Sequence, residues 1–489
     1  MAQLGAARPG AEILLQRVRP ATLGLVLAKH GGLASILFGV PLIWALIEGS
    51  WGLAVALGPA VFAGAIMSAL VWSRDLPRDL RGVEAMATIA LVFLLSALLS
   101  VPAFMTLGLS FTAALFEGMS AVTTTGLSMA SAPDDWPFAG HVLRSWMQWC
   151  GGLVMATAVV ALVLGPGPAA RTMGRAGIDD GDRITSTRMQ ARELLGAYLA
   201  ITVIAAAAIG LALGRWDEAL VLALSAVSTG GFAPRSDSLA SYDVLVQSLV
   251  IGASVLGAIS LLALTQTVRS SGPPLWRAPS VRRVLGAVVL SALLLAIVRP
   301  FVVTETGYLP TLLNLLSGLS TAGYSTGPMP TTPALLTIFI VAMIIGGDRG
   351  STAGGLKLAR LATAVGATRH ALTLSRLSER AVAPLRSDGD VVSPDYLITT
   401  LAILLLYVTS TLAVWSMLLL LGHPPMPALF DTISTLSTVG LSTGVIGPDL
   451  GPGSQIVLTL AMWMGRLEFI AVLVLILPGT WRARPLKGA

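Results

Sequence analysis

Long apolar stretches alternate with short polar ones along this chain, and their arrangement repeats. Two apolar stretches come first, at residues 21–47 and 51–72. After them, the chain has four units. Each contains a long apolar stretch, a short apolar stretch, a small motif, a polar loop and a second long apolar stretch. The first long stretches lie near 84–107, 193–214, 281–303 and 394–421, and the second near 142–164, 244–268, 333–360 and 454–479. Such a period indicates a repeated structural unit.

The short apolar stretches decide how each unit meets a membrane. They lie near 111–123, 216–228, 309–320 and 425–437. A helix of about a dozen residues cannot cross a hydrocarbon core of ~30 Å, so these lengths predict re-entrant half-helices. The sequence therefore predicts an all-α polytopic membrane protein with ten spanning helices and four pseudo-symmetric membrane-pore-membrane repeats. The expected divisions are 1–80 for two extra N-terminal helices and 81–170, 171–275, 276–370 and 371–489 for the repeats.

Composition and charge place the chain in a bilayer and orient it. Of the 489 residues, 55% are apolar and 11% are charged, too few charges to cover several water-soluble domains. All but six of the 31 Lys and Arg residues fall in segments that the alternation places on one side. By the positive-inside rule, both termini and the basic loops are expected to be cytoplasmic. The exceptions are Arg144, Arg215, Arg235, Arg299, Arg349 and Arg466.

The residue inventory argues against several other functions. The net charge of +6 is spread over short loops rather than gathered in one module, so no nucleic-acid partner is expected. One cysteine, Cys150, allows no intrachain disulfide, and the four histidines lie in separate segments without metal-ligand spacing. No Walker loop and no GxGxxG after a strand is present, so we expect no nucleotide to bind this chain.

A motif at the end of each short stretch carries the main chemical prediction. It reads as a hydroxyl residue, Thr, one variable residue, Gly and an apolar residue. The copies are TTTGLS at 123–128, STGGFA at 228–233, STAGYS at 320–325 and STVGLS at 437–442. Irregular backbone at membrane depth is tolerated only inside protein or beside a wet cavity. Carbonyl oxygens from four such segments can replace the hydration shell of a monovalent cation. Each copy alone could be a simple helix C-cap, but four equivalent copies favour a pore.

Polar residues inside the short stretches are candidate supports for this pore. Nine residues before the motif glycines stand Glu117, Leu222, Asn314 and Asp431. We expect Glu117, Asn314 and Asp431 to hydrogen-bond the neighbouring motif backbone or to add negative field.

A glycine-rich stretch interrupts the second long stretch of the third unit. Residues 344–360 read IIGGDRGSTAGGLKLAR, and five glycines do not maintain a straight helix. We expect a loop here, with Asp348 and Arg349 either paired or facing water. The alternative is a small-residue packing face. The residues of the predicted loop are Gly346, Gly347, Asp348, Arg349, Gly350, Ser351, Thr352, Ala353, Gly354 and Gly355.

Arg466 is a charge within the apolar run 456–477. Charge at membrane depth is costly and is a functional hypothesis by default. The alternative is a structural ion pair, with Glu468 or with an acid on another helix.

At this point the chain resembles the TrkH/KtrB superfamily of potassium transport proteins, and the TrkH branch in particular. The resemblance rests on the four motifs, RSWMQWCGG at 144–152, GGDRGSTAGGLK at 346–357, GRLEF at 465–469 and the two extra N-terminal helices. It implies a potassium-selective filter, with the glycine-rich loop as an intramembrane gate and Arg466 facing the permeation path. The implied filter residues are Thr124, Thr125, Gly126, Thr229, Gly230, Gly231, Thr321, Ala322, Gly323, Thr438, Val439 and Gly440.

The same resemblance implies partners and an ion preference. It implies a homodimer in the bacterial inner membrane, docked on a cytoplasmic ring of RCK subunits of the TrkA type. In related proteins a serine at the first filter glycine accompanies sodium permeation, so Gly126 favours potassium as the transported ion. Two positions depart from the family pattern: Asp348-Arg349 replaces small or neutral residues, and Ala233 replaces a common hydroxyl residue.

Other functions remain as alternatives. A sodium-permeable or ion-coupled variant of the same family is the nearest one. A coupled transporter of an organic solute would have broken helices in two corresponding halves rather than four like motifs. An intramembrane enzyme would need a convergent nucleophile or metal set, which the scattered histidines and single cysteine do not supply. We therefore predict gated uptake of potassium, without enzymatic activity.

Overall fold

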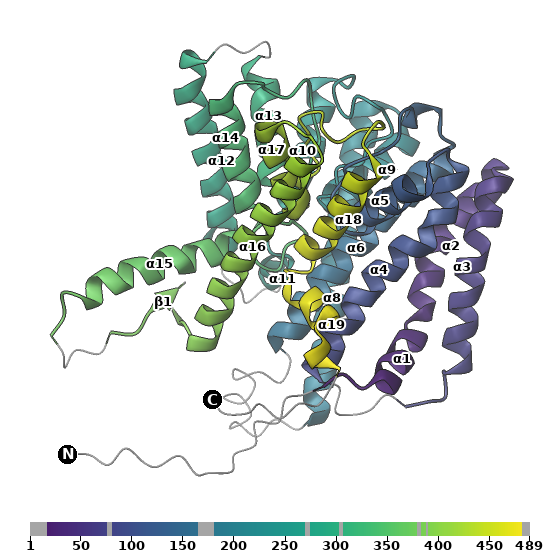
Figure 1. Cartoon of the computed structure of the whole chain (residues 1–489), viewed down its shortest axis with the longest axis horizontal. Helices are drawn as coiled ribbons and strands as arrows, with labels where there is room; N and C mark the ends of the chain where they lie inside the picture. The colour runs from purple at the N-terminus through teal and green to yellow at the C-terminus, as the bar shows by residue number, and fades with distance from the viewer. Residues whose placement is uncertain are drawn as a thin grey trace.

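A computed structural model describes residues 17–75, 81–164, 180–268, 274–302, 307–378, 383–387 and 390–481. The predicted cytoplasmic termini, 1–16 and 482–489, lie outside the described residues, as does part of each predicted basic loop. The described chain is a bundle of helices (Figure 1). Its two strands, β1 (Arg386–Ser387) and β2 (Asp390–Val391), form one short antiparallel pair. The predicted all-α class is confirmed.

The N-terminal helices α1 (Pro20–Lys29), α2 (Gly31–Glu48) and α3 (Trp51–Leu70) form one flank of the bundle in Figure 1. The helices α2 and α3 approach closely because Gly31 and Gly64 face each other. A Cβ atom on Gly64 would collide with the Gly31 carbonyl oxygen. Ser35 reinforces this contact by donating a hydrogen bond to the Val61 carbonyl at 2.8 Å.

The four units follow the predicted order. Their first long helices are α4 (Gly82–Thr106), α8 (Asp180–Leu213), α12 (Pro279–Val298) and α16 (Pro394–Leu420). Their short helices are α5 (Phe111–Val122), α9 (Trp216–Val227), α13 (Tyr308–Leu319) and α17 (Pro425–Leu436), each of 12 residues. At about 1.5 Å per residue, a short helix covers roughly 18 Å, so the prediction that it cannot span a membrane is confirmed.

The second long stretches differ from one unit to the next. In the first unit α6 (Phe138–Leu164) is continuous. The others are broken into α10 (Val244–Gly257) and α11 (Leu261–Val268), α14 (Pro333–Ile345) and α15 (Leu358–Leu374), and α18 (Pro452–Arg466) and α19 (Ile470–Ile476). The interruption at 346–357 was predicted. The prediction of continuous helices at 244–268 and 454–479 was wrong.

Local backbone contacts explain the two unexpected breaks. Between α10 and α11, the Ala258 carbonyl accepts a hydrogen bond from the amide of Asp348, which belongs to the third unit. Between α18 and α19, Glu468 and Phe469 have positive φ angles of 54° and 65°, and the two helices are bent by 117°. Six helices in the described part of the chain are long and apolar enough to span a membrane, or seven if this bent pair counts as one span.

The remaining described elements are short. They are the 3-10 turns η1 (Pro133–Asp135), η3 (Leu275–Arg277), η4 (Arg299–Phe301) and η5 (Pro478–Thr480). The Val18 amide donates to the Thr480 carbonyl at 3.0 Å, so the two ends of the described chain lie side by side. In Figure 1, α15 extends away from the bundle beside β1.

A close glycine contact recurs between the short helix and the helix that follows it. Gly151 of α6 lies against the Val122 carbonyl, Gly257 of α10 against Val227, and Gly465 of α18 against Leu436. Each of these carbonyls belongs to the last residue of a short helix. The equivalent contacts show that the first, second and fourth units share one packing arrangement, which brings the end of the short helix against the helix that follows it.

Replacing Gly465 with alanine is expected to lower stability, because the new Cβ would collide with the backbone of Leu436. Overpacking of this kind costs about 1–3 kcal/mol. The matched control is Gly252→Ala in α10, where a Cβ meets nothing within 4 Å. Its melting temperature in detergent should stay level or rise, because alanine favours a helix. Equal melting temperatures for the two variants would contradict this packing account.

Candidate functional site

The four motif segments, 123–128, 228–233, 320–325 and 437–442, meet in a closed ring. A Cβ on Gly126 would collide with the Gly230 carbonyl oxygen, and one on Gly231 with that of Ala322. In the same way Gly323 faces the Val439 carbonyl, and Gly440 returns to that of Thr125. Each motif glycine is therefore required for the approach of the next segment. The order around the ring follows the order of the units in the chain.

Each motif segment closes its short helix with the same backbone turn. The residue before each glycine donates its N–H to the carbonyl of a serine five residues earlier, at 2.8–2.9 Å. The preceding threonine donates to the carbonyl three residues earlier, which completes a Schellman cap. The serines are Ser120, Ser225, Ser317 and Ser434. The C-cap interpretation of the motif is thus correct locally, and the cap is also part of the ring.

The cap has an unusual residue in its left-handed position. Glycine normally fills it, but here Thr124, Thr229, Thr321 and Thr438 do, with φ between 49° and 56°. A β-branched residue at positive φ costs about 1–3 kcal/mol and persists only where surrounding contacts impose it. The glycines two residues later also have positive φ, from 72° to 105°. Four repeats of one strained conformation mark these segments as the candidate site.

Asp431 supports the fourth motif segment as expected. Its buried carboxylate accepts hydrogen bonds from the Ser442 hydroxyl at 2.6 Å and from the Thr443 amide at 2.9 Å. It also accepts from the Thr443 hydroxyl at 3.0 Å and the Ile446 amide at 3.2 Å. Asp431 therefore holds the backbone that follows the glycine.

Glu117 and Asn314 have the same function in the first and third segments. Glu117 accepts from the Ser128 hydroxyl at 3.0 Å and the Met129 amide at 2.9 Å. Asn314 accepts from the Thr326 amide at 2.6 Å and its hydroxyl at 2.9 Å. Each of these side chains accepts hydrogen bonds from residues that stand two or three positions after its own motif glycine.

The second unit lacks this support, and its sequence explains why. Leu222 occupies the equivalent position, and the segment it would serve continues with Ala233 and Pro234. Alanine has no hydroxyl and proline has no N–H, so an acceptor here would have no donor to satisfy. The missing acceptor at Leu222 and the missing donors at Ala233 and Pro234 therefore compensate for each other.

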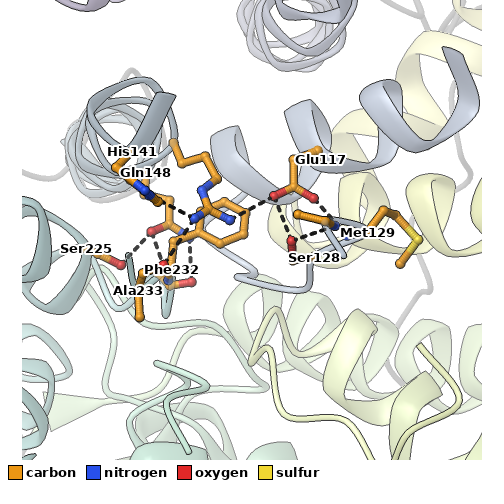
Figure 2. Close-up of polar contacts among 11 residues, drawn as sticks. Glu117, Ser128, Met129, His141, Gln148, Ser225, Phe232 and Ala233 are labelled. Carbon is orange, nitrogen blue, oxygen red and sulfur yellow. Dashed lines mark hydrogen bonds and ion pairs between the residues drawn. The ribbon is translucent and has the colours of Figure 1, made fainter. Parts of the chain in front are cut away.

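Two residues of α6 support the second segment instead, and Figure 2 shows the contacts of one of them, Gln148. The Gln148 amide donates to the Gly230 carbonyl at 2.5 Å, and its oxygen accepts from the Ser225 hydroxyl at 2.6 Å and the Phe232 amide at 3.4 Å. Arg144 donates to the Ala233 carbonyl at 3.1 Å. Sequence reasoning did not assign Gln148 a role, although it lies within the stretch that carried the family resemblance.

Arg144 also joins the first segment to the second. Its guanidinium lies 3.3 Å from the Glu117 carboxylate and donates to His141 Nδ1 at 3.1 Å (Figure 2). It stacks over the rings of Trp136 and Phe232, with centroids at 4.6 Å and 4.8 Å. The side chain is only 2% exposed. The charge that was an exception to the positive-inside pattern is therefore a buried link between two neighbouring segments.

The glycine-rich loop, residues 346–355, lies directly beneath the ring. Thr352 donates its hydroxyl to the carbonyls of Val227 and Gly257, both at 3.0 Å. The Gly354 amide donates to the Thr321 hydroxyl at 2.7 Å, and the Gly355 amide to the Ser437 carbonyl at 3.1 Å. The loop is thus hydrogen-bonded to parts of the second, third and fourth units at once. The predicted loop is confirmed.

Asp348 adopts neither of the two predicted arrangements: it does not pair with Arg349, and it does not face water. Asp348 is fully buried and pairs with Arg283 of α12, through Nη2 at 2.7 Å and Nε at 3.2 Å. It also accepts from the Ala359 amide at 3.1 Å, at the start of α15. Arg349 instead lies over the Tyr396 ring, 5.1 Å from its centroid. The interpretation of Asp348 as a partner of Arg349 was therefore wrong.

Arg466 ends α18 beside the same loop and is 4% exposed. It donates through Nη1 to the Thr352 carbonyl at 2.8 Å, while its Nε and Nη2 have no partner among the described residues. Glu468, the acid suggested as its partner, forms a salt bridge with Arg360 of α15 at 2.5 Å. Arg466 therefore binds the loop through a backbone carbonyl and does not pair with the Glu468 carboxylate.

Comparison with known proteins agrees with this architecture. A family model described as a cation transport protein, TrkH, matches residues 63–268 and 305–479. The chain belongs to the TrkH family. Named relatives include the Trk system potassium uptake protein TrkH of Halomonas elongata, 29% identical over 69% of this chain and 73% of that protein. The protein of the same name in Escherichia coli (strain K12) is 25% identical over 71% and 75%.

A solved structure extends the TrkH comparison to the fold. The crystal structure of the potassium transporter TrkH from Vibrio parahaemolyticus superposes with a TM-score of 0.82 and covers 95% of this chain and 100% of that one. The sequence identity is 22%, so this likeness concerns the fold. The polytopic membrane architecture of the TrkH family is therefore shared by this chain.

Replacing Arg144 with glutamine is expected to destabilise the protein strongly, because Glu117 would be left buried without its cation. Breaking a buried ion pair from one side costs about 3–5 kcal/mol. The matched control is Arg215→Gln, since that side chain is 56% exposed and pairs with the exposed Asp217 and with Glu218, which is largely buried but keeps its contacts with Arg235 and Tyr242. A loss of about 0–1 kcal/mol is expected there. Thermal unfolding in detergent measures both, and similar melting temperatures would show that Arg144 has no special structural role.

Proposed function

We propose that this protein takes up potassium ions through the opening enclosed by the four motif segments. The observation that carries the proposal is the ring, in which each motif glycine faces the carbonyl of the next segment. Oxygen atoms arranged in rings can replace the water around a monovalent cation. The short helices end at this ring, so their partial negative charge adds to the attraction for a cation. The relatives named as potassium uptake proteins support the choice of ion.

The residues present suit such an ion. Each segment has a threonine at positive φ, and the hydroxyls of Thr124 and Thr438 are buried without a partner among the described residues. Buried hydroxyls are almost always hydrogen-bonded, so such atoms suggest oxygen ligands for an ion or water. The filter would consist of the three residues up to each motif glycine, and the carboxylate and amide supports would keep its backbone rigid.

The glycine-rich loop and Arg466 would form the constriction below this filter. The loop is tied to three units, and Arg466 holds the Thr352 carbonyl. A buried guanidinium, two of whose nitrogens have no partner in the described part of the chain, would raise the energy of a cation that passes beside it. The family resemblance supports a homodimer on a cytoplasmic RCK ring that regulates this loop. The contact between Val18 and Thr480 is consistent with termini on one side, as the charge pattern of the loops suggests.

Growth rescue tests the function. A bacterium deficient in potassium uptake is transformed with this chain, with and without a co-expressed RCK partner, and is grown at limiting potassium. Rescue is expected, and a requirement for the partner would support regulation by the RCK ring. Absence of growth in both conditions, with membrane insertion confirmed, would reject potassium uptake.

Gly126→Ser is expected to increase sodium permeation relative to potassium. The serine Cβ would collide with the Gly230 carbonyl and displace it from the ring. The measurement is the ratio of sodium to rubidium flux in proteoliposomes. Gly327→Ser is the control, because a Cβ there meets nothing within 4 Å. If both variants keep the parent ratio, Gly126 does not determine ion preference.

Arg466→Gln is expected to raise cation flux in the absence of a regulatory partner. The change removes the positive charge beside the pathway, while an amide can still donate to the Thr352 carbonyl. Rubidium uptake into proteoliposomes measures the effect, with Arg215→Gln as a control for loss of a surface arginine. Flux equal to that of the parent would contradict an electrostatic barrier at this residue.

A further inference from the structure

The glycine-rich loop places hydrogen-bond donors on three oxygen atoms where the short helices meet the ring, and one of them, the Thr321 hydroxyl, belongs to the proposed filter. The three donors are the Thr352 hydroxyl, the Gly354 amide and the Gly355 amide. Their acceptors are the Val227 carbonyl at 3.0 Å, the Thr321 hydroxyl at 2.7 Å and the Ser437 carbonyl at 3.1 Å. The loop therefore contacts the ring through polar hydrogens rather than through apolar packing alone.

All three acceptors lie at the inner end of a short helix. Val227 is the last residue of α9, Ser437 follows α17, and Thr321 is the second residue after α13. The carbonyls of a helix C-terminus lack partners within the helix and carry partial negative charge. Such oxygens are satisfied either by an N–H or O–H donor or by a cation. The closed loop supplies donors to three of the four short helices.

The first unit provides the contrast. The Thr124 hydroxyl is equivalent to that of Thr321, is fully buried and has no partner among the described residues. The Val122 carbonyl, which ends α5, lies against Gly151 of α6 just as the Val227 carbonyl lies against Gly257, but among the described residues it accepts no hydrogen bond from the loop. Two equivalent threonines therefore differ in one respect: only Thr321 has its hydroxyl bonded to the loop.

We propose that loop closure and cation binding at the inner end of the ring compete for the same oxygen atoms. This inference rests on the proposed potassium pathway and adds a form of regulation to it. With the loop in the observed position, Gly354 occupies a lone pair of Thr321 that a cation would otherwise use. Binding equilibria are reciprocal, so a cation that binds better without the loop contacts must favour loop opening by the same factor. The transported ion would thus help to open its own gate.

Thiol labelling of the loop measures the competition. Ser351 is 3% exposed, and Cys150 is the single cysteine of the chain. The parent for the test is therefore Cys150→Ala with Ser351→Cys, reconstituted in proteoliposomes and labelled with a soluble maleimide. Potassium chloride is exchanged for N-methylglucamine chloride at constant ionic strength. Labelling is expected to accelerate several-fold with potassium and to saturate, because potassium favours the state in which residue 351 is accessible.

Two matched variants isolate the loop contact. Thr321→Val and Thr124→Val each remove one hydroxyl from equivalent places in the ring, but only the first removes a bond to the loop. Without potassium, Thr321→Val should label faster than Thr124→Val, on the order of fivefold for a hydrogen bond of ordinary net strength. Potassium should then accelerate Thr321→Val less than Thr124→Val. Thr321→Ser restores the hydroxyl and should return the labelling rate to that of the parent.

The outcomes separate this inference from the proposed function. Melting temperatures and size-exclusion profiles confirm that each variant is folded, and rubidium uptake is measured in the same vesicles. Rubidium uptake by the parent, combined with labelling that ignores potassium, would overturn the competition alone. The same labelling rate for Thr321→Val and Thr124→Val would also overturn it. No uptake and no potassium effect on labelling would overturn both proposals.

Discussion

The structure depends on four short helices that end in buried backbone oxygens at one place. Carbonyl groups in a low-dielectric interior require a partner. Each helix is closed by the same cap, with threonine in a position that normally needs glycine. The close approach of four such ends leaves no room for side chains, so glycine is required both in the ring and on the helices that pack behind it. The repeated sequence pattern follows from this crowding.

The two sides of the ring are supported in different ways. In three units the backbone that leaves the ring is held by a polar side chain of the unit's own short helix, and in the second unit it is held by Gln148 and Arg144 of α6. The opposite side of the ring is covered by the glycine-rich loop, which is held by ion pairs between residues far apart in the chain. Asp348 ties the loop to α12 through Arg283, and Arg360 ties α15 to Glu468 beside Arg466. These ion pairs connect the segment below the ring to α15, which extends from the bundle (Figure 1). A movement of α15 would therefore reach both the loop and Arg466.

Sequence reasoning predicted the features that depend on local pattern. The short helices, the four motifs, the support from Asp431 and the break at the glycine-rich loop all follow from residue type and spacing. Serine six residues before each motif glycine is a further periodic signal that was present but overlooked. The links between units could not be predicted in this way. Gln148 and Gly230 are 82 residues apart, and Arg283 and Asp348 are 65 apart, so only the packed fold shows that they meet. The breaks after Gly257 and Arg466 arise from tertiary contacts and from positive φ at non-glycine residues.

The second motif segment shows that the units are not fully independent of one another. Its own short helix offers Leu222, and its backbone is positioned by Gln148 and Arg144 from the helix that ends the preceding unit. The units therefore resemble one another in shape without being interchangeable parts. A chimaera that exchanged the second unit alone would separate the segment from its supports, whereas exchange of the first two units together would keep them. The first two units thus act as one module in the support of the ring, although the sequence repeats four times.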